Sequence, residues 1–151
     1  MNYTIQYTRD YALYSQIHDA LYSYNLSKNG AARLDIKAPE YPDCEALVVV
    51  GDDNKLYGGI VWHWQDEHSV ARVDYFFTDD MLRGRGYGKV LFAEFEKSAI
   101  AAGAKAISLC TNSFQAPRLY EKMGFKVAST KSDPQPRVPE NLVYEFIKEL
   151  S

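Results

Sequence analysis

This sequence of 151 residues has only two cysteines, no long apolar run, and fewer basic residues (17) than acidic ones (20). The two cysteines, Cys44 and Cys110, belong to no Cys-x-x-Cys or Cys/His cluster, so we expect no metal site. No apolar run approaches the roughly 20 residues of a membrane-spanning helix, so we expect no membrane association. The net charge of −3 argues against a nucleic-acid-binding protein whose affinity comes from neutralising phosphates.

The N-terminal residues also lack the basic segment and the apolar core of a signal peptide, so we expect a cytoplasmic protein with reduced cysteines. The length suits one domain with its own hydrophobic core, which we expect to span residues 1–151. Tyrosine is abundant, with 12 copies. These rings either pack with their hydroxyls in water or line an amphipathic pocket, and packing is the favoured interpretation.

The segment that says most about function is residues 83–89, Arg-Gly-Arg-Gly-Tyr-Gly-Lys, between an apolar strand and an amphipathic helix. Its alternate glycines allow successive backbone amides to turn toward one anion. The free amides and the positive dipole end of the following helix favour an anion at the same place. The segment therefore predicts an anion-binding loop, and the alternative is a glycine-rich turn without a ligand.

Spacing separates three phosphate-binding motifs here. A Walker A loop is excluded because Arg83 stands where its first glycine belongs and Val90 where its Ser/Thr belongs. A Gly-x-Gly-x-x-Gly dinucleotide fingerprint fails because no third glycine follows at the required distance. The remaining pattern, Arg-x-x-Gly-x-Gly at Arg83, Gly86 and Gly88, resembles the coenzyme A pyrophosphate loop of the GNAT superfamily of N-acetyltransferases.

Apolar alternation and short apolar runs predict strands along most of the chain. The predicted strands are residues 2–8, 45–50, 55–65, 69–78, 105–110, 125–129 and 141–149. Gly58-Gly59 predicts a bulge or a close backbone approach. Trp62 and Trp64 should share one face of their strand, with His63 on the other.

Helical spacing predicts three helices, and glycines predict where they end. They are residues 10–30, 86–103 and 114–124, with Pro117 in the first turn of the last. In the second helix one apolar stripe is expected, formed by Leu91, Phe95, Ala99 and Ala102. Residues 31–43 are expected to form a short helix or loop and residues 131–140 a loop, because both segments contain prolines.

A second motif, Ala116-x-x-x-Tyr120 followed by Glu-Lys-Met-Gly-Phe, strengthens the resemblance, because its spacing to the glycine loop matches that of the two core motifs of GNAT enzymes. The similarity covers about residues 69–127 and looks like that of small, stand-alone bacterial members. One departure is Ser113, where many members have asparagine, with Asn112 one position earlier.

The resemblance implies an α/β (α+β) fold: a mixed, mostly antiparallel central sheet flanked by helices and splayed into a V between its central strands. It implies acetyl-CoA as co-substrate in the cleft, with residues 74–78 of the strand edge pairing with the pantetheine amides as a peptide would. The residues that it places at coenzyme A are Phe76, Phe77, Thr78, Arg83, Gly84, Arg85, Gly86, Tyr87, Gly88, Lys89, Asn112 and Ser113. Tyr120 would donate a proton to the departing thiolate, or pack beneath the loop.

Direct attack by an amine also requires a general base. Asp74 is the candidate, directly or through water, although a buried or surface-paired carboxylate explains it equally well. Asp79 and Asp80 fit better as caps of the loop. His63 and His68 could serve in catalysis or metal binding, but an isolated strand histidine is more often structural.

The sequence thus predicts an N-acetyltransferase that moves the acetyl group of acetyl-CoA to a primary amine by direct attack. The alternative is a non-catalytic acyl-CoA binding or sensing module of the same fold. A basic-loop nucleic-acid binder conflicts with the charge balance. The expected partner is a small-molecule or exposed amine, and a homodimer is compatible with the sequence.

Overall fold

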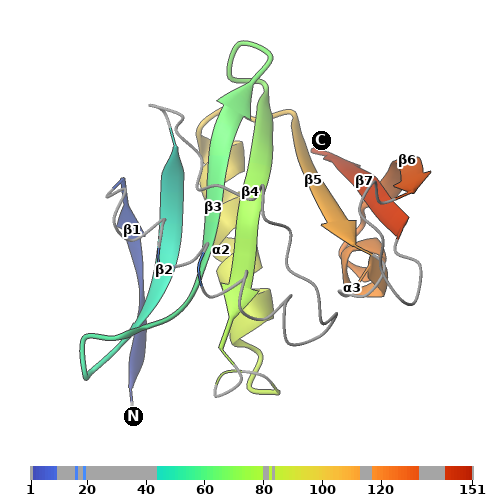
Figure 1. Cartoon of the computed structure of the whole chain (residues 1–151). Coiled ribbons are helices and arrows are strands. Elements are labelled where there is room, and N and C mark those ends of the chain that lie inside the picture. Colours follow the sequence, from blue (N-terminus) through green and yellow to red (C-terminus); the bar gives the residue numbers. More distant parts are fainter. Residues whose placement is uncertain are drawn as a thin grey trace.

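The computed structural model describes residues 2–9, 16, 19, 44–79, 82, 84–112, 117–132 and 142–150. They form a seven-stranded sheet in the order β1-β2-β3-β4-β5-β7-β6 with two helices against it (Figure 1). The strands are β1 (Tyr3–Thr8), β2 (Glu45–Gly51), β3 (Leu56–Gln65), β4 (Val70–Thr78), β5 (Ala106–Asn112), β6 (Lys126–Ser132) and β7 (Leu142–Glu149). The helices are α2 (Tyr87–Ala101) and α3 (Pro117–Lys122).

The sheet is antiparallel except between β4 and β5, and there it splays open. The parallel ladder holds only three residue pairs, Val70 with Ala106, Ala71 with Ile107 and Arg72 with Ser108. Beyond Arg72, β4 continues to Thr78 while β5 moves away from it (Figure 1). The predicted mixed, mostly antiparallel sheet with a V between its central strands is confirmed.

The narrow end of this V is held by side chains as well as by the ladder. The Arg72 guanidinium donates to both carboxylate oxygens of Glu145 on β7, and its Nη1 also donates to Ser108 Oγ on β5 at 3.3 Å. A bidentate arginine–carboxylate pair has a fixed planar geometry. The contact therefore ties β4, β5 and β7 together where the splay begins.

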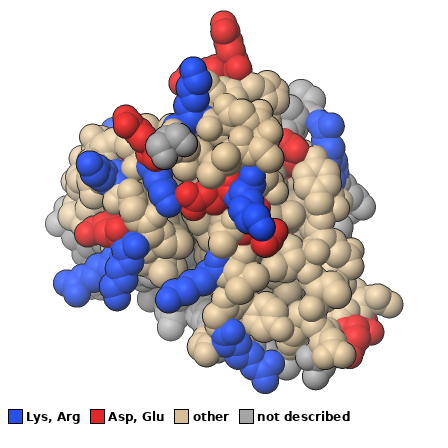
Figure 2. Space-filling model, turned by 180° about the vertical axis from the view of Figure 1, so that it is seen from behind, with Lys and Arg blue, Asp and Glu red and all other residues tan. Residues whose placement is uncertain are grey.

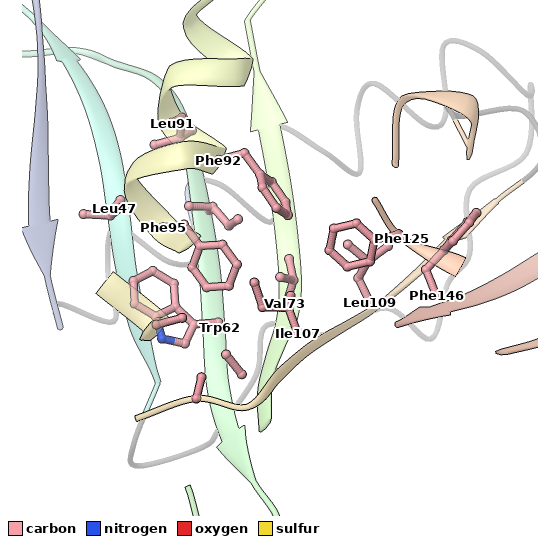
Figure 3. Close-up of a cluster of buried hydrophobic side chains, with 14 of the residues drawn as sticks. Leu47, Trp62, Val73, Leu91, Phe92, Phe95, Ile107, Leu109, Phe125 and Phe146 are labelled. Carbon is pink, nitrogen blue, oxygen red and sulfur yellow. The ribbon is translucent and has the colours of Figure 1, made fainter. Parts of the chain in front are cut away.

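The main core lies between the sheet and α2. Phe92 and Phe95 of α2 are buried, and Phe95 packs on Trp62 of β3 with ring centroids 4.8 Å apart (Figure 3). Trp62 and Trp64 contact this core while His63 points to the opposite face, as predicted. The predicted stripe of α2 needs one change, because Ala102 is exposed and Phe92 is the additional buried residue.

The predicted strands are all present, and no boundary differs from the prediction by more than three residues. Gly103 and Gly124 have φ of 97° and 95° and follow the ends of α2 and α3, as predicted for helix stops. The described part of the last helix begins at Pro117. Gln16 and Asp19 are helical, and the remainder of the predicted helix at 10–30, like residues 31–43 and 133–140, lies outside the described residues.

The bulge and the close backbone approach that were predicted at Gly58-Gly59 are both found at Gly58. The β2–β3 register shifts between Val49, opposite Gly58, and Val50, opposite Leu56, so Tyr57 is the extra residue of a bulge. A Cβ atom on Gly58 would lie 2.8 Å from the Phe77 carbonyl oxygen and 3.3 Å from Thr78 Cα. These are backbone atoms of β4, so this glycine permits the close approach of β3 and β4.

Replacing Gly58 with alanine is therefore expected to destabilise the fold by about 1–3 kcal/mol, because backbone must move to admit the methyl group. Denaturant unfolding measures the change. Gly88→Ala is the matched control, since a Cβ there meets only Phe76 and Thr78 side chains at 3.8 and 4.0 Å. Alanine also favours the helix by up to about 1 kcal/mol, so this control should not destabilise. Equal stability of Gly58→Ala and the wild type would contradict the close approach.

Acidic and basic side chains are interspersed over the face of the molecule seen in Figure 2. One pair of opposite charges links two elements of the fold, because Lys148 Nζ of β7 lies 2.8 Å from Glu96 Oε1 of α2. The described part of this face shows no broad field of one sign, in keeping with the net charge. Neither described helix is long and apolar enough to cross a membrane.

Candidate active site

The glycine loop forms an open, left-handed entry into α2. Gly84 and Gly86 have φ of 76° and 79°, and Gly86 is the N-cap of α2. The first helical hydrogen bond runs from Val90 N–H to the Gly86 carbonyl at 3.1 Å, so the amides of residues 87–89 face out of the helix end. No side chain caps this end, and its first turn carries no acidic residue. This arrangement suits an anion.

The start of α2 lies against the end of β4. A Cβ on Gly88 would contact the side chains of both Phe76 and Thr78. The structure thus brings the glycine loop together with the strand segment that the sequence assigned to the same ligand. Arg85 and Lys89 are exposed beside the loop and add positive charge there, while Arg83 lies outside the described residues.

Tyr120 stands across the splay from β4, inside a series of aromatic contacts. The Phe92 ring lies 5.5 Å from Phe76 of β4 and 6.2 Å from Tyr120 of α3, and Tyr120 lies 6.0 Å from Phe146 of β7. Figure 3 shows Phe92 extending from α2 beside β4, with Phe125 and Phe146 beyond it. We call Phe76, Phe92, Tyr120 and Phe146 the aromatic bridge. It covers the splay on the α2 side of the sheet.

Burial of Tyr120 raises the pKa of its phenol to about 12. Its hydroxyl accepts or donates no hydrogen bond among the described residues, and it is not enclosed. The ring of Tyr120 packs against the core, and its role as a donor to the thiolate stays a prediction. A neutral phenol with a raised pKa is a persistent hydrogen-bond donor.

Asp74 is the extra residue of a second bulge, on β4. The β3–β4 register passes from Val61 opposite Tyr75 to Trp62 opposite Val73, which leaves Asp74 without an opposite residue. Val73 packs in the core with α2, whereas Tyr75 packs with the cluster on the other face. Bulges of this kind turn a strand and redirect a side chain. Here Asp74 is directed to the face opposite α2.

The Asp74 carboxylate has two differently engaged oxygens. Oδ2 lies 2.7 Å from His63 Nδ1 and accepts a weak hydrogen bond from Cys44 Sγ at 3.8 Å. Oδ1 accepts no hydrogen bond from a described residue and is not enclosed. Burial raises the pKa of the Asp74 carboxyl, and His63, Arg72 and Cys44 offset part of that rise. The result is a partly buried carboxylate with one oxygen fixed and one available.

The sequence did not single out the contact between His63 and Asp74, because it depends on the register of β3 and β4. His68 lies in the β3–β4 turn, and its ring stacks on that of Trp64 with ring centroids 4.9 Å apart. This turn is at the opposite end of β4 from the glycine loop.

The remaining predicted residues are placed only in part. Phe76 faces α2 and Phe77 the opposite side of β4. Tyr87 is the first residue of α2 and lies 5.4 Å from the Tyr3 ring. Asn112 ends β5 opposite Val143, and Ser113, like Asp80, lies outside the described residues. Within the described ranges, no group of three or more His, Cys, Asp or Glu side chains could hold a metal ion.

The glycine loop thus lies beside the open splay of the sheet, with Asp74 on one face and Tyr120 on the other. A family model described as the acetyltransferase (GNAT) family matches residues 11–125. The chain belongs to this family, and membership supports an acetyl-CoA-dependent acyltransferase.

Individual relatives agree with this assignment. A blasticidin-S acetyltransferase from Streptomyces morookaense is 33% identical over 108 residues, which cover 70% of this chain and 74% of that protein. The crystal structure of an acetyltransferase from Bacillus cereus ATCC 14579 is 28% identical with a TM-score of 0.63, covering 90% of each chain. A protein from Bacillus anthracis str. Ames, solved in complex with acetyl coenzyme A, shares the fold at 18% identity and a TM-score of 0.63, covering 80% of this chain and 73% of that one.

Proposed function

We propose that this protein is an N-acetyltransferase that transfers the acetyl group of acetyl-CoA to a primary amine by direct attack. The observation that carries the proposal is the continuity of the glycine loop, the end of β4 and the splay beyond Arg72. The uncapped, positive end of α2 fits a pyrophosphate. At about 3.3 Å per residue, Thr78 to Asp74 spans roughly 13 Å, a reach comparable to that of the pantetheine arm.

In this assignment the amides of residues 84–88 hold the pyrophosphate, with Arg83, Arg85 and Lys89 adding charge. The β4 edge at Phe76, Phe77 and Thr78 guides the pantetheine into the splay, and Asn112 and Ser113 are assigned to the same arm. The acetyl thioester then lies inside the splay, with Asp74 on one face of the sheet and Tyr120 on the other face.

The acceptor ammonium has to lose two protons for the amide to form, and the thiolate has to gain one. Asp74 Oδ1 accepts one proton from the acceptor ammonium, which leaves a neutral amine. The amine nitrogen bonds to the thioester carbon as the carbon–sulfur bond breaks, and the electron pair goes to sulfur. The nitrogen loses its second proton to solvent or to Asp74 after exchange, and Tyr120 donates a hydrogen bond or a proton to the thiolate. The products are the N-acetylated amine and coenzyme A.

We propose a small-molecule amine as the acceptor, and blasticidin S is the first probe, because a curated relative is named for that substrate. The test is a panel of blasticidin S, a polyamine, free amino acids and a peptide with a free N-terminus, measured by release of free thiol from acetyl-CoA. Amine-dependent thiol release supports the proposal. Tight acetyl-CoA binding without release for any amine would instead favour the acyl-CoA sensing module.

Replacing Gly86 with valine is expected to weaken acetyl-CoA binding by about tenfold or more. A branched side chain would disfavour the left-handed backbone and block approach to the loop amides, and losing one amide–phosphate bond costs roughly 1.5–3 kcal/mol. Isothermal titration calorimetry measures the affinity.

Gly103→Val is the matched control. Gly103 also has a positive φ and open space around its Cβ position, but it lies at the other end of α2. Both variants should lose similar stability, and only Gly86→Val should lose affinity. Unchanged affinity in folded Gly86→Val would exclude the loop as the pyrophosphate site.

A further inference from the structure

His63 and Asp74 are a pair of titratable side chains on the face of the sheet opposite α2. His63 belongs to β3 and Asp74 to the bulge of β4, and β4 lies between β3 and the splay. The side chain of Asp74 is 14% exposed and that of His63 is 7% exposed. Asp74 is therefore the outer member of the pair, nearer to the splay, and His63 lies behind it.

The hydrogen bonds fix which atoms of the pair remain available. His63 Nδ1 and Cys44 Sγ both approach Oδ2, while Oδ1 has no partner among the described residues. The Gln65 side-chain amide nitrogen lies 3.4 Å from His63 Nε2. With that amide as donor, Nε2 accepts and Nδ1 carries the hydrogen, which is then donated to Asp74.

We propose that His63 is the positioning residue of the general base: its Nδ1–H holds Oδ2 of Asp74 so that Oδ1 faces the acceptor amine. This inference rests on the proposed acetyl transfer. His63 itself does not touch the substrate. It favours the ionised form of the carboxylate, since a hydrogen bond to the charged form stabilises that form.

The other groups around Asp74 affect its ionisation less than His63 does. Cys44, before β2, is a weak donor to the same oxygen. The charge of Arg72, on β4, also favours the ionised form of Asp74, but Arg72 is paired with Glu145 of β7. Burial acts in the opposite direction and raises the carboxyl pKa. His63 is therefore the group whose removal should move the ionisation of Asp74 most.

The test is the pH profile of kcat/KM for the best amine of the panel, measured on the full chain. His63→Leu removes the donor and should move the acidic limb to higher pH by about one unit or more, with activity recovering at high pH. His63→Asn places an amide N–H near the position of Nδ1 and should keep the limb near its wild-type position. His68→Leu, a change of the exposed turn histidine, is the matched control and should not move it.

A second measurement needs no acceptor. The 13C resonance of the Asp74 carboxyl reports its titration directly, and its midpoint should rise in His63→Leu. If His63→Leu does not fold, Cys44→Ala removes the weaker donor and should raise the midpoint by a smaller amount. A midpoint that is the same in wild type and in the folded donor-deficient variants would overturn the inference. Absence of amine acetylation with the midpoint shifted would overturn the proposed function and the orientation toward an amine, but not the control of Asp74 ionisation by His63.

Discussion

Replacing Asp74 with asparagine is expected to lower kcat/KM for amine acetylation by about 10²- to 10⁴-fold, with acetyl-CoA affinity nearly unchanged. Asparagine keeps the size of the side chain and can still accept the His63 hydrogen bond, but it cannot take a proton. The loss of kcat/KM should be largest below the pKa of the acceptor amine, because there the base has to deprotonate an ammonium. It should narrow at high pH, where the free amine is already present.

The sign of the pH dependence follows from the environment of Asp74. Burial raises the carboxyl pKa, and only the ionised form accepts a proton, so the wild-type rate should rise with pH through that raised pKa. The asparagine variant should lack this limb and keep only the rise that belongs to the amine. Asp66→Asn, in the exposed β3–β4 turn, is the control. A folded Asp74→Asn enzyme with wild-type kcat/KM at neutral pH would remove Asp74 from the mechanism.

The second large effect is expected from Tyr120→Phe, which should lower kcat by about 10²- to 10⁴-fold if chemistry is rate-limiting. The pKa of Tyr120 is about 12 and that of a thiol is near 8.5, so full proton transfer to a free thiolate costs roughly 5 kcal/mol. A hydrogen bond that strengthens as charge gathers on sulfur avoids most of that cost. The hydroxyl therefore acts best as a donor that keeps its proton until the bond has broken.

The same pKa predicts the shape of the alkaline side of the profile. A phenol with a pKa of about 12 stays protonated through the usual assay range, so kcat should show no Tyr120-dependent fall below about pH 10. Phenylalanine preserves the aromatic bridge, so stability and acetyl-CoA affinity should change little. Tyr144→Phe, whose ring packs 6.1 Å from Phe146, is the matched control. A kcat within a factor of about three of wild type would leave Tyr120 with a packing role only.

The features predicted correctly from the sequence are those set by local chemistry. The left-handed conformations of Gly84, Gly86, Gly103 and Gly124 follow from residue type and position relative to the helices. The strands follow from apolar patterning, which is also local. Tyr7 shows the limit of that patterning: it lies on the apolar face of β1 yet is 54% exposed, with its hydroxyl bonded to Glu45.

The sequence indicates Asp74 as the candidate base, but its hydrogen-bond partner His63 could not be predicted in the same way. Regular alternation from Val73 would place residues 75 and 77 on the core face, but the bulge at Asp74 moves Tyr75 and Phe77 to the other face. Neither residue type nor spacing reveals a bulge that arises from the pairing of two strands. The contact between His63 and Asp74 depends on that bulge. His63 therefore looks isolated in the sequence but forms a hydrogen bond with Asp74 in the folded protein.

The short seam between β4 and β5 gives this sheet two inner edges, in addition to the outer edges formed by β1 and β6. An open strand edge normally invites another polypeptide to pair with it and so promotes aggregation. Here the edge of β4 beyond Arg72 looks into a wedge that the Arg72–Glu145 pair closes at one end and the aromatic bridge covers from one side. A polypeptide would have to bring side chains into that covered space. The pantetheine arm has amide groups but no such side chains, so it would not. The site proposed for the pantetheine arm would thus be an open strand edge that other copies of the chain could reach only poorly.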